Sequence, residues 1–224
     1  MPEPSKLDRI VSVSLTVATF VVVALLLERR FTPSGKSKER VVYVKDWRDR
    51  LVVAGRAIGD PGGIVTVAVF TDFECPYCRR MDSTLAVLVA RFPGKVSQVV
   101  MHLPLSQHRY ARPAAVAFEC ALRVGHAEQM HRALYGSQDS LGKLSWAQYG
   151  ARAGIRDTTA FAGCIAADSQ PSMVVAGQQQ ARALKVSSTP TVLVNGWMFD
   201  PSLPEDIERA VAAAVQGKSP NSVR

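Results

Sequence analysis

Two kinds of hydrophobic pattern alternate along this chain. Mostly apolar runs at 64–70 and 96–105 have the length and composition of buried strands. Between these runs, apolar residues recur at the spacing of one buried helical face, at Met81, Leu85, Leu88 and Phe92. Pro76 suits the first position of that helix, where a missing N–H costs nothing, and Pro93-Gly94 ends it. The pattern therefore predicts strand, helix and strand in this order.

The rest of the chain predicts helices followed by a hairpin. Residues 109–185 are rich in alanine, have helical spacing and are punctuated by glycines. Asn195-Gly196 lies between two apolar runs, which is the strongest short signal for a β-hairpin. A closing helix is expected over 205–215, and a short strand over 56–60. The chain is therefore predicted to be an α/β fold whose sheet is interrupted by a helical insertion.

The amino terminus carries a candidate membrane anchor. Residues 10–27 contain no charged side chain, and this length falls within the roughly 17–25 residues of a spanning helix. A small-residue cleavage site is absent after Leu27, so a retained anchor is expected rather than a cleaved signal peptide. Positive charges at 29–40 would by the positive-inside rule keep the domain in the cytoplasm. Long domains cross membranes largely regardless of such charges. We therefore base the orientation on the cysteine chemistry, which favours the extracytoplasmic side.

Composition and charge exclude several classes of function. The chain has 224 residues and a net charge of +8. Its Lys and Arg residues are scattered and form no stripe interleaved with aromatic residues, as a nucleic-acid-binding surface would require. A Gly-rich phosphate loop and a Ser/His/Asp arrangement are also absent from the sequence. We therefore expect no nucleic-acid partner and turn to the four cysteines.

The candidate chemistry lies in a Cys75-x-x-Cys78 motif, where the first buried strand gives way to a helix. Two cysteines at this spacing on the first helical turn can close a disulfide, because their Cα atoms fall within the roughly 4.4–6.8 Å window. The free N–H groups and the positive end of the helix dipole stabilise a thiolate on Cys75. Arg79 and Arg80 are further candidate contributors. The sequence thus predicts a redox-active dithiol with Cys75 at the exposed tip.

The other two cysteines, Cys120 and Cys164, lie in separate predicted helices. A disulfide between them would close a long loop and stabilise the fold by up to about 4 kcal/mol. Alternatively, both are buried free thiols that pack as small hydrophobic residues. The even cysteine count and the membrane anchor favour the disulfide, because both suggest an oxidising compartment.

Three segments in this order resemble a known family. Residues 72–78 read DFECPYC after an apolar strand, the long helical insertion follows, and residues 188–196 read STPTVLVNG before the last helix. Together they resemble a DsbA-like thiol–disulfide oxidoreductase of the thioredoxin superfamily, over roughly residues 54–217. A CxxC motif alone would be weak, but its place at a strand-to-helix junction ahead of a later Thr-Pro is specific.

The resemblance implies roles for individual residues. Cys75 would be the exposed nucleophile and Cys78 the shielded resolving cysteine. Thr189-Pro190 would form a cis peptide bond facing the disulfide, and the backbone before the proline would pair with a substrate strand. Many thioredoxin-like sequences carry a buried Asp or Glu that assists proton transfer at the inner sulfur, whereas this chain has Val69 there. Cys78 would then lose its proton through water or a substrate group.

The implied architecture is a thioredoxin-like α/β fold with an inserted all-helical domain, preceded by one N-terminal transmembrane helix. We expect the membrane anchor at 1–30 and a juxtamembrane linker at 31–53. The thioredoxin-like domain is expected over 54–108 and 186–220, and the helical insertion over 109–185.

The expected function is that of a thiol–disulfide oxidoreductase that forms disulfides in exported proteins through the Cys75–Cys78 pair. The enzyme would be a single-pass protein of the cell membrane with its catalytic domain on the extracytoplasmic, periplasmic side. The family implies reduced exported proteins as substrates and a quinone-linked membrane partner, DsbB-like or vitamin-K-epoxide-reductase-like, that reoxidises the pair. It implies neither a metal nor an organic cofactor.

Three alternatives remain open. The first is a disulfide reductase or isomerase on the same fold, which would differ in redox potential. The second is a non-enzymatic binding protein in which the CxxC forms an inert structural disulfide. The third is a zinc module in which Cys75 and Cys78 are joined by two histidines, although the histidines lack the usual tight spacing. The candidate ligands are His102, His108, His126 and His131.

Overall fold

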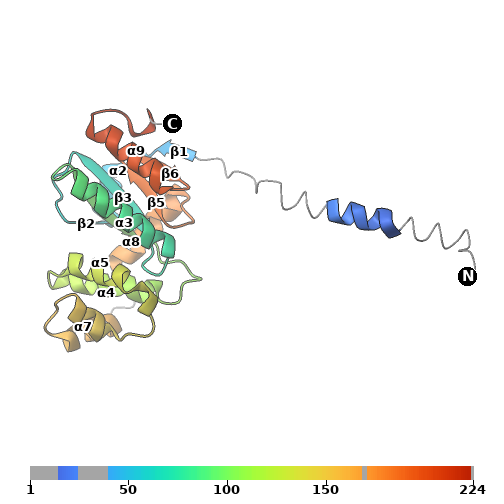
Figure 1. Ribbon diagram of the computed structural model, residues 1–224. Coiled ribbons are helices and arrows are strands. Elements are labelled where there is room, and N and C mark those ends of the chain that lie inside the picture. The colour runs from blue at the N-terminus through green and yellow to red at the C-terminus, as the bar shows by residue number, and fades with distance from the viewer. Residues whose placement is uncertain (1–14, 25–39, 168–170, 223–224) are drawn as a thin grey trace, which may run out of the picture. The chain divides into compact units, whose positions relative to one another are not determined.

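The structure is a computed structural model that describes residues 15–24, 40–167 and 171–222 (Figure 1). The chain divides into two compact units, Met1–Glu39 and Arg40–Arg224. In the first, residues 15–24 form a helix, and the two ends of the predicted span 10–27 lie outside the described residues. Within the described ranges, no helix has both the length and the apolar character needed to cross a membrane. The membrane anchor therefore stays a prediction.

A six-stranded mixed sheet forms the centre of the second unit (Figure 1). Its strand order is β1-β6-β5-β3-β4-β2. Only β3 and β4 run parallel to each other, whereas every other neighbouring pair in this sheet is antiparallel. The strands are β1 (Arg40–Tyr43), β2 (Gly55–Ile58), β3 (Val65–Thr71), β4 (Val96–His102), β5 (Thr191–Val194) and β6 (Trp197–Asp200). The predicted α/β class is confirmed, and the two apolar runs and the Asn-Gly hairpin supply the four central strands.

Helices cover both faces of this sheet (Figure 1). The period-two alternation of β3 directs Val67 to one face and Phe70 to the other. Val67 packs with Leu85 and Ile207 in one apolar cluster, whereas Phe70 packs with Ala181 in another. The first face carries α3 (Pro76–Arg91) and α9 (Pro204–Val215), and the second carries α2 (Trp47–Ala54) and α8 (Ser172–Leu184).

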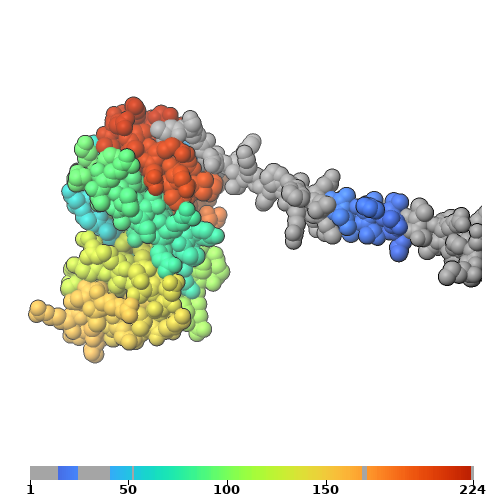
Figure 2. All heavy atoms as spheres, in the orientation of Figure 1, coloured from blue at the N-terminus to red at the C-terminus, as the bar shows by residue number. Residues whose placement is uncertain are grey.

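Four further α-helices and a 3-10 helix of the described residues form a lobe beside the sheet, drawn in yellow and light orange in Figure 2. Large apolar side chains such as Phe118 and Tyr149 are fully buried in its core. The lobe consists of α4 (Ala111–Arg123), α5 (Ala127–Gly136), the 3-10 helix η1 (Gln138–Ser140), α6 (Trp146–Arg152) and α7 (Thr158–Ala167). The last helix of the predicted insertion, α8, lies instead against β4. Gly177 permits this contact, because a Cβ there would come within 2.3 Å of the His102 carbonyl oxygen.

The predicted linker at 31–53 is wrong over its second half. Residues from Arg40 onward belong to the folded domain, where β1 adds to the sheet beside β6 and α2 packs on one face. Trp47 anchors α2 because it is 5% exposed and lies against Gly196 in the hairpin turn. The many charged residues around Trp47 conceal this contact in the sequence pattern.

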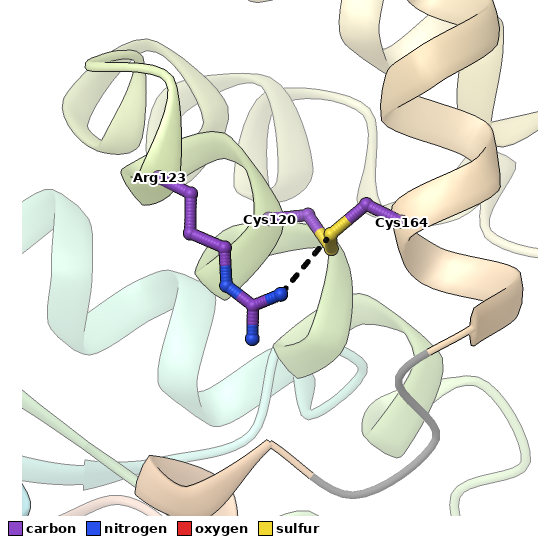
Figure 3. Close-up of a disulfide and its surroundings, with 3 residues drawn as sticks. All are labelled: Cys120, Arg123 and Cys164. Carbon is purple, nitrogen blue, oxygen red and sulfur yellow. Dashed lines mark hydrogen bonds between the residues drawn. A yellow bond between two sulfur atoms is a disulfide. The ribbon is translucent and has the colours of Figure 1, made fainter.

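Cys120 of α4 and Cys164 of α7 are joined by a disulfide, with an S–S distance of 1.95 Å and a Cα–Cα distance of 6.1 Å (Figure 3). The Arg123 guanidinium lies beside it, with Nη1 3.6 Å from the Cys164 sulfur. The bond connects the first helix of the lobe to its last, so it restrains the whole lobe.

Removing this disulfide should destabilise the protein. The cross-link spans 44 residues, and loop-closure entropy for such a loop amounts to about 4 kcal/mol, of which proteins usually realise only a part. We expect the Cys120→Ala/Cys164→Ala variant to unfold at a clearly lower denaturant concentration than the parent under non-reducing conditions. Equilibrium unfolding measures this directly. An unchanged midpoint would show that packing alone holds α4 against α7.

Candidate active site

The two cysteines of the CxxC motif lie at the point where β3 passes into α3. Cys75 is the N-cap residue of α3 with an extended backbone (φ −74°, ψ 120°), and Pro76 occupies the first helical turn, as predicted. The amide of Cys78 donates a hydrogen bond to the Cys75 carbonyl oxygen at 3.1 Å. The helix start therefore holds both side chains on one side of a single turn.

A buried carboxylate fixes the loop before the motif. Asp72 is 1% exposed. It accepts hydrogen bonds from the amides of Glu74 and Leu105 at 2.8 and 2.9 Å, and its Oδ2 lies 2.8 Å from Nδ1 of His108. The Cys75 amide in turn donates to the Asp72 carbonyl oxygen at 3.1 Å. Asp72 therefore acts as the anchor of the active-site loop, a role that its sequence context did not reveal.

A second anchor comes from the helical lobe. The Gln138 side chain, buried in η1, donates from Nε2 to the carbonyl oxygens of Phe73 and Cys75 at 2.8 and 3.0 Å. These bonds tie the main chain on both sides of Glu74, next to the reactive cysteine, to the helical lobe. Sequence reasoning missed both Gln138 and His108, because a polar residue in a helical or loop pattern gives no signal of a distant backbone partner.

The topology explains how the Thr189-Pro190 segment reaches the motif. β5 runs antiparallel to β3, with Thr191 opposite Phe70, so the start of β5 lies where β3 ends. The Thr189-Pro190 peptide bond is cis. The Cys75 sulfur lies 3.4 Å from the Thr189 carbonyl oxygen, to which the thiol donates a hydrogen bond when it is protonated. The structure thus brings the CxxC motif and the Thr-Pro segment into direct contact.

The expectation that Cys75 is exposed is wrong. Cys75 is only 4% exposed and Cys78 is 1% exposed. The cause is the contact with Thr189, which covers the outer sulfur, together with packing against the helical lobe. Tyr77 between the two cysteines is 71% exposed.

The two thiols have opposite acidities. The pKa of Cys75 is lowered from 9.0 to about 5, chiefly because the Cys78 thiol donates a hydrogen bond to its sulfur. Burial opposes this shift, and the backbone amides of Tyr77 and Cys78 at the helix start add to it. The pKa of Cys78 is raised, chiefly by its burial. At neutral pH the reduced site therefore holds a Cys75 thiolate beside a Cys78 thiol.

The arginines after the motif do not contribute as the sequence suggested. The lowering of the Cys75 pKa arises from the neighbouring thiol, backbone amides and Thr189, and neither Arg79 nor Arg80 is among its causes. Arg79 instead forms a salt bridge of 2.9 Å to the exposed carboxylate of Asp139. The Cys78 thiol and the amides of the helix start, and not nearby cations, lower the pKa of Cys75.

The zinc alternative lacks a geometric basis. Each of the four histidines faces a different partner. His102 lies next to Glu119, and His108 lies next to Asp72. His126 faces the Ala153 carbonyl oxygen, and His131 faces Asp82. Among the residues that the structure describes, no group of three His, Cys, Asp or Glu side chains is placed to hold a metal ion. The histidines therefore serve separate parts of the fold.

Sequence comparison identifies the family. Residues 52–213 match the Thioredoxin_4 family of thioredoxins. This chain belongs to the thioredoxin family. This membership confirms the predicted resemblance to the thioredoxin superfamily.

Several solved structures share the fold of this chain. A thioredoxin-like oxidoreductase from Silicibacter pomeroyi superposes with a TM-score of 0.64 at 23% identity, covering 77% of this chain and 99% of its own. Oxidised BdbD from Bacillus subtilis has a TM-score of 0.63 at 17% identity, covering 72% and 92%. DsbA from Xylella fastidiosa has a TM-score of 0.56 at 22% identity, covering 79% and 94%.

Curated sequences with detectable similarity are much longer than this chain. The Na(+)/H(+) antiporter NhaA 3 of Salinispora tropica is 35% identical over 133 residues, which are 59% of this chain. NhaA 1 of Salinispora arenicola is 33% identical over 155 residues, which are 68% of this chain. The matches span only 20% and 24% of those antiporters. Such partial matches transfer no antiporter activity to this chain.

Proposed function

We propose that this chain is a DsbA-like thiol–disulfide oxidoreductase that works as an oxidase and passes the Cys75–Cys78 disulfide to reduced substrate proteins. The observation that carries the proposal is the lowered pKa of Cys75, about 5 against an ordinary 9.0. A thiol of low pKa is a good leaving group, and its thiolate is stabilised in the reduced protein. Both effects favour release of the disulfide to a substrate.

The size of this effect can be estimated. At pH 7 a thiol with a pKa of about 5 lies two units into its ionised range, which stabilises the reduced site by about 3 kcal/mol. For a two-electron couple this corresponds to a potential about 60 mV more oxidising than that of an unperturbed pair. Such a difference moves the couple towards the oxidising end of the range that thioredoxin-like proteins cover.

The exchange proceeds in two steps through a mixed disulfide between the substrate and Cys75. A substrate thiolate attacks Cys75, the bond between Cys75 and Cys78 breaks, and Cys78 leaves with the electron pair and takes up a proton. The second thiolate of the substrate then attacks the substrate sulfur in the mixed disulfide. The substrate disulfide forms, and Cys75 leaves as the stable thiolate. The Thr189 carbonyl, 3.4 Å from the Cys75 sulfur, is the main-chain acceptor next to the reaction. We assign Thr189 and Pro190 to substrate binding for this reason.

We place the enzyme at the cell membrane, anchored by residues 10–27, with its folded unit on the extracytoplasmic side. Two observations support this location. The stretch 10–27 is uncharged, and a disulfide joins Cys120 to Cys164, a feature typical of oxidising compartments. The substrates would be reduced exported proteins, and a quinone-linked membrane partner would reoxidise the Cys75–Cys78 pair.

The direction of the reaction is tested with the full-length chain in detergent. The chain is equilibrated in glutathione buffers to obtain the potential of the Cys75–Cys78 pair, and its oxidised form is mixed with a reduced test protein. We expect a potential at least about 60 mV less negative than the roughly −270 mV of thioredoxin, together with rapid oxidation of the test protein. A potential near that of thioredoxin without oxidation would instead identify a reductase.

A further inference from the structure

A small polar cavity lies behind the inner cysteine. Its volume is about 10 Å³, which is close to the space that one water molecule needs. Six polar side chains line it: Thr71, Cys78, Asp82, Gln98, His131 and Tyr135. They come from β3, α3, β4 and α5, so the cavity forms only where the helical lobe meets the sheet and α3.

The polar side chains form contacts around the cavity. Nε2 of His131 lies 3.4 Å from Oδ1 of Asp82, and Gln98 donates to the same oxygen at 3.3 Å. Thr71 and Tyr135 share a hydrogen bond of 2.5 Å between their hydroxyl groups. The histidine is buried, whereas the Asp82 side chain is 21% exposed. Asp82 therefore links the cavity to solvent.

The chemistry requires a proton route at this place. Burial raises the pKa of Cys78, so its sulfur must gain a proton when it leaves the disulfide and lose one when it attacks. Val69 also lines the cavity and has no exchangeable proton. It occupies the position at which many thioredoxin-like sequences carry a buried acid. The route must therefore use other groups in the cavity wall.

The charge states of the side chains that line the cavity single out the Asp82–His131 pair. Tyr135 is fully buried and its pKa is raised, chiefly by desolvation, so it stays protonated at neutral pH. Burial lowers the pKa of His131, against the attraction of Asp82, so the imidazole is free to accept a proton. Its other charged or titratable neighbours are His102 on β4, Cys78 on α3, and Glu128, Arg132 and Tyr135 on its own helix.

We propose that the Asp82–His131 pair exchanges protons with the Cys78 thiol through one water molecule in this cavity. The inference deepens the proposed function, on which it rests. When Cys78 attacks a mixed disulfide on Cys75, its S–H bond breaks and the proton passes to the pair. The new bond joins Cys78 to Cys75, and the other sulfur leaves as a thiolate with the electron pair. When Cys78 is the leaving group, the pair returns the proton.

A single-turnover experiment isolates this step. The reduced full-length chain is mixed with one equivalent of Ellman's reagent. Cys75 attacks the reagent, expels one thionitrobenzoate and keeps the other as a mixed disulfide, and attack by Cys78 on Cys75 then releases this second thionitrobenzoate, which is the step measured. We expect Asp82→Asn and His131→Gln to slow the release at pH 7 by about tenfold or more, the scale of lost acid–base assistance. Their rates should approach the parent rate at high pH, where hydroxide removes the proton. Asp82→Glu, which keeps a carboxylate, should restore most of the rate.

Two further variants serve as matched controls. Asp139→Asn removes a carboxylate that pairs with Arg79 outside the cavity, and His126→Gln removes a histidine that faces the Ala153 carbonyl in the same lobe. Both should release thionitrobenzoate at the parent rate. Alkylation of Cys75 should proceed equally in all variants, because the proposed role concerns Cys78 alone.

The outcomes separate the inference from the proposed function. Parent-like rates and pH profiles in folded Asp82→Asn and His131→Gln proteins would overturn the inference and leave the oxidase function intact. If Asp82→Asn does not fold, His131→Gln and Asp82→Glu decide the question. A parent chain that releases thionitrobenzoate but oxidises no substrate protein would overturn the proposed function and leave the proton route standing.

Discussion

Replacing Cys75 by serine is expected to abolish thiol–disulfide exchange, with a loss of roughly a thousandfold or more. Cys75 supplies the sulfur that a substrate attacks, and its thiolate is the leaving group whose pKa of about 5 makes transfer favourable. Serine forms no disulfide, so no intermediate can be built on it. The rate at which the chain oxidises a reduced test protein in a glutathione buffer measures the loss. The Cys120→Ala/Cys164→Ala variant, which lacks two cysteines outside the motif, should keep the parent rate below its unfolding midpoint.

Replacing Cys78 should have a different effect. Cys78 is the more deeply buried of the two, at 1% exposed, and its role is to resolve the mixed disulfide on Cys75. Cys78→Ser should therefore accumulate covalent complexes with substrate proteins, visible on non-reducing gels, whereas Cys75→Ser should accumulate none. Complexes that form through Cys78 in the Cys75→Ser protein would reverse the assigned roles. Such complexes would also show that the Thr189-Pro190 segment does not direct substrates to Cys75.

The stability of the reduced protein should fall steeply on the acid side of neutrality. The pKa of Cys75 is lowered on folding from 9.0 to about 5, so the unfolded chain binds more protons between these values and stability rises with pH there. The contribution of the Cys75 thiolate to the free energy of unfolding is complete above pH 9 and is lost as the pH falls through 5. Between pH 7 and pH 5 the loss amounts to about 2 kcal/mol.

This pH dependence is isolated by comparison with a variant. Unfolding of the reduced parent chain and of reduced Cys75→Ala is followed in urea at several pH values, and the difference between their unfolding free energies is plotted. We expect the difference to shrink as the pH drops from 7 to 5, because only the parent carries the thiolate. A pH-independent difference would mean that folding leaves the acidity of Cys75 unchanged.

The order of the elements could be predicted from the sequence because its signals are local. Apolar runs and the Asn195-Gly196 pair predicted the four central strands, and β3 to β6 lie there. The spacing of Met81, Leu85 and Leu88 predicted the buried face of α3, and all three are at most 2% exposed. The early β1 and α2 were missed, because their burial depends on contacts with the distant hairpin and sheet.

The candidate site was predictable only in part, for a related reason. The sequence identified Cys75 and Cys78 because the CxxC motif and the start of α3 are adjacent in the chain. The anchoring side chains Gln138 and His108 could not be predicted, because their partners are backbone and carboxylate groups far away in the sequence. The burial of Cys75 was missed in the same way, since its cover comes from the Thr189 loop.

The acidity of Cys75 is measured most directly by its alkylation rate. The reduced full-length chain is treated with iodoacetamide from pH 3 to pH 10, and mass spectrometry locates the modified cysteine. We expect modification at Cys75, with a half-maximal rate near pH 5, while Cys78 stays largely unmodified at neutral pH. A half-maximal rate near pH 9, or a Cys75 that does not react, would contradict an activated thiolate at the start of α3.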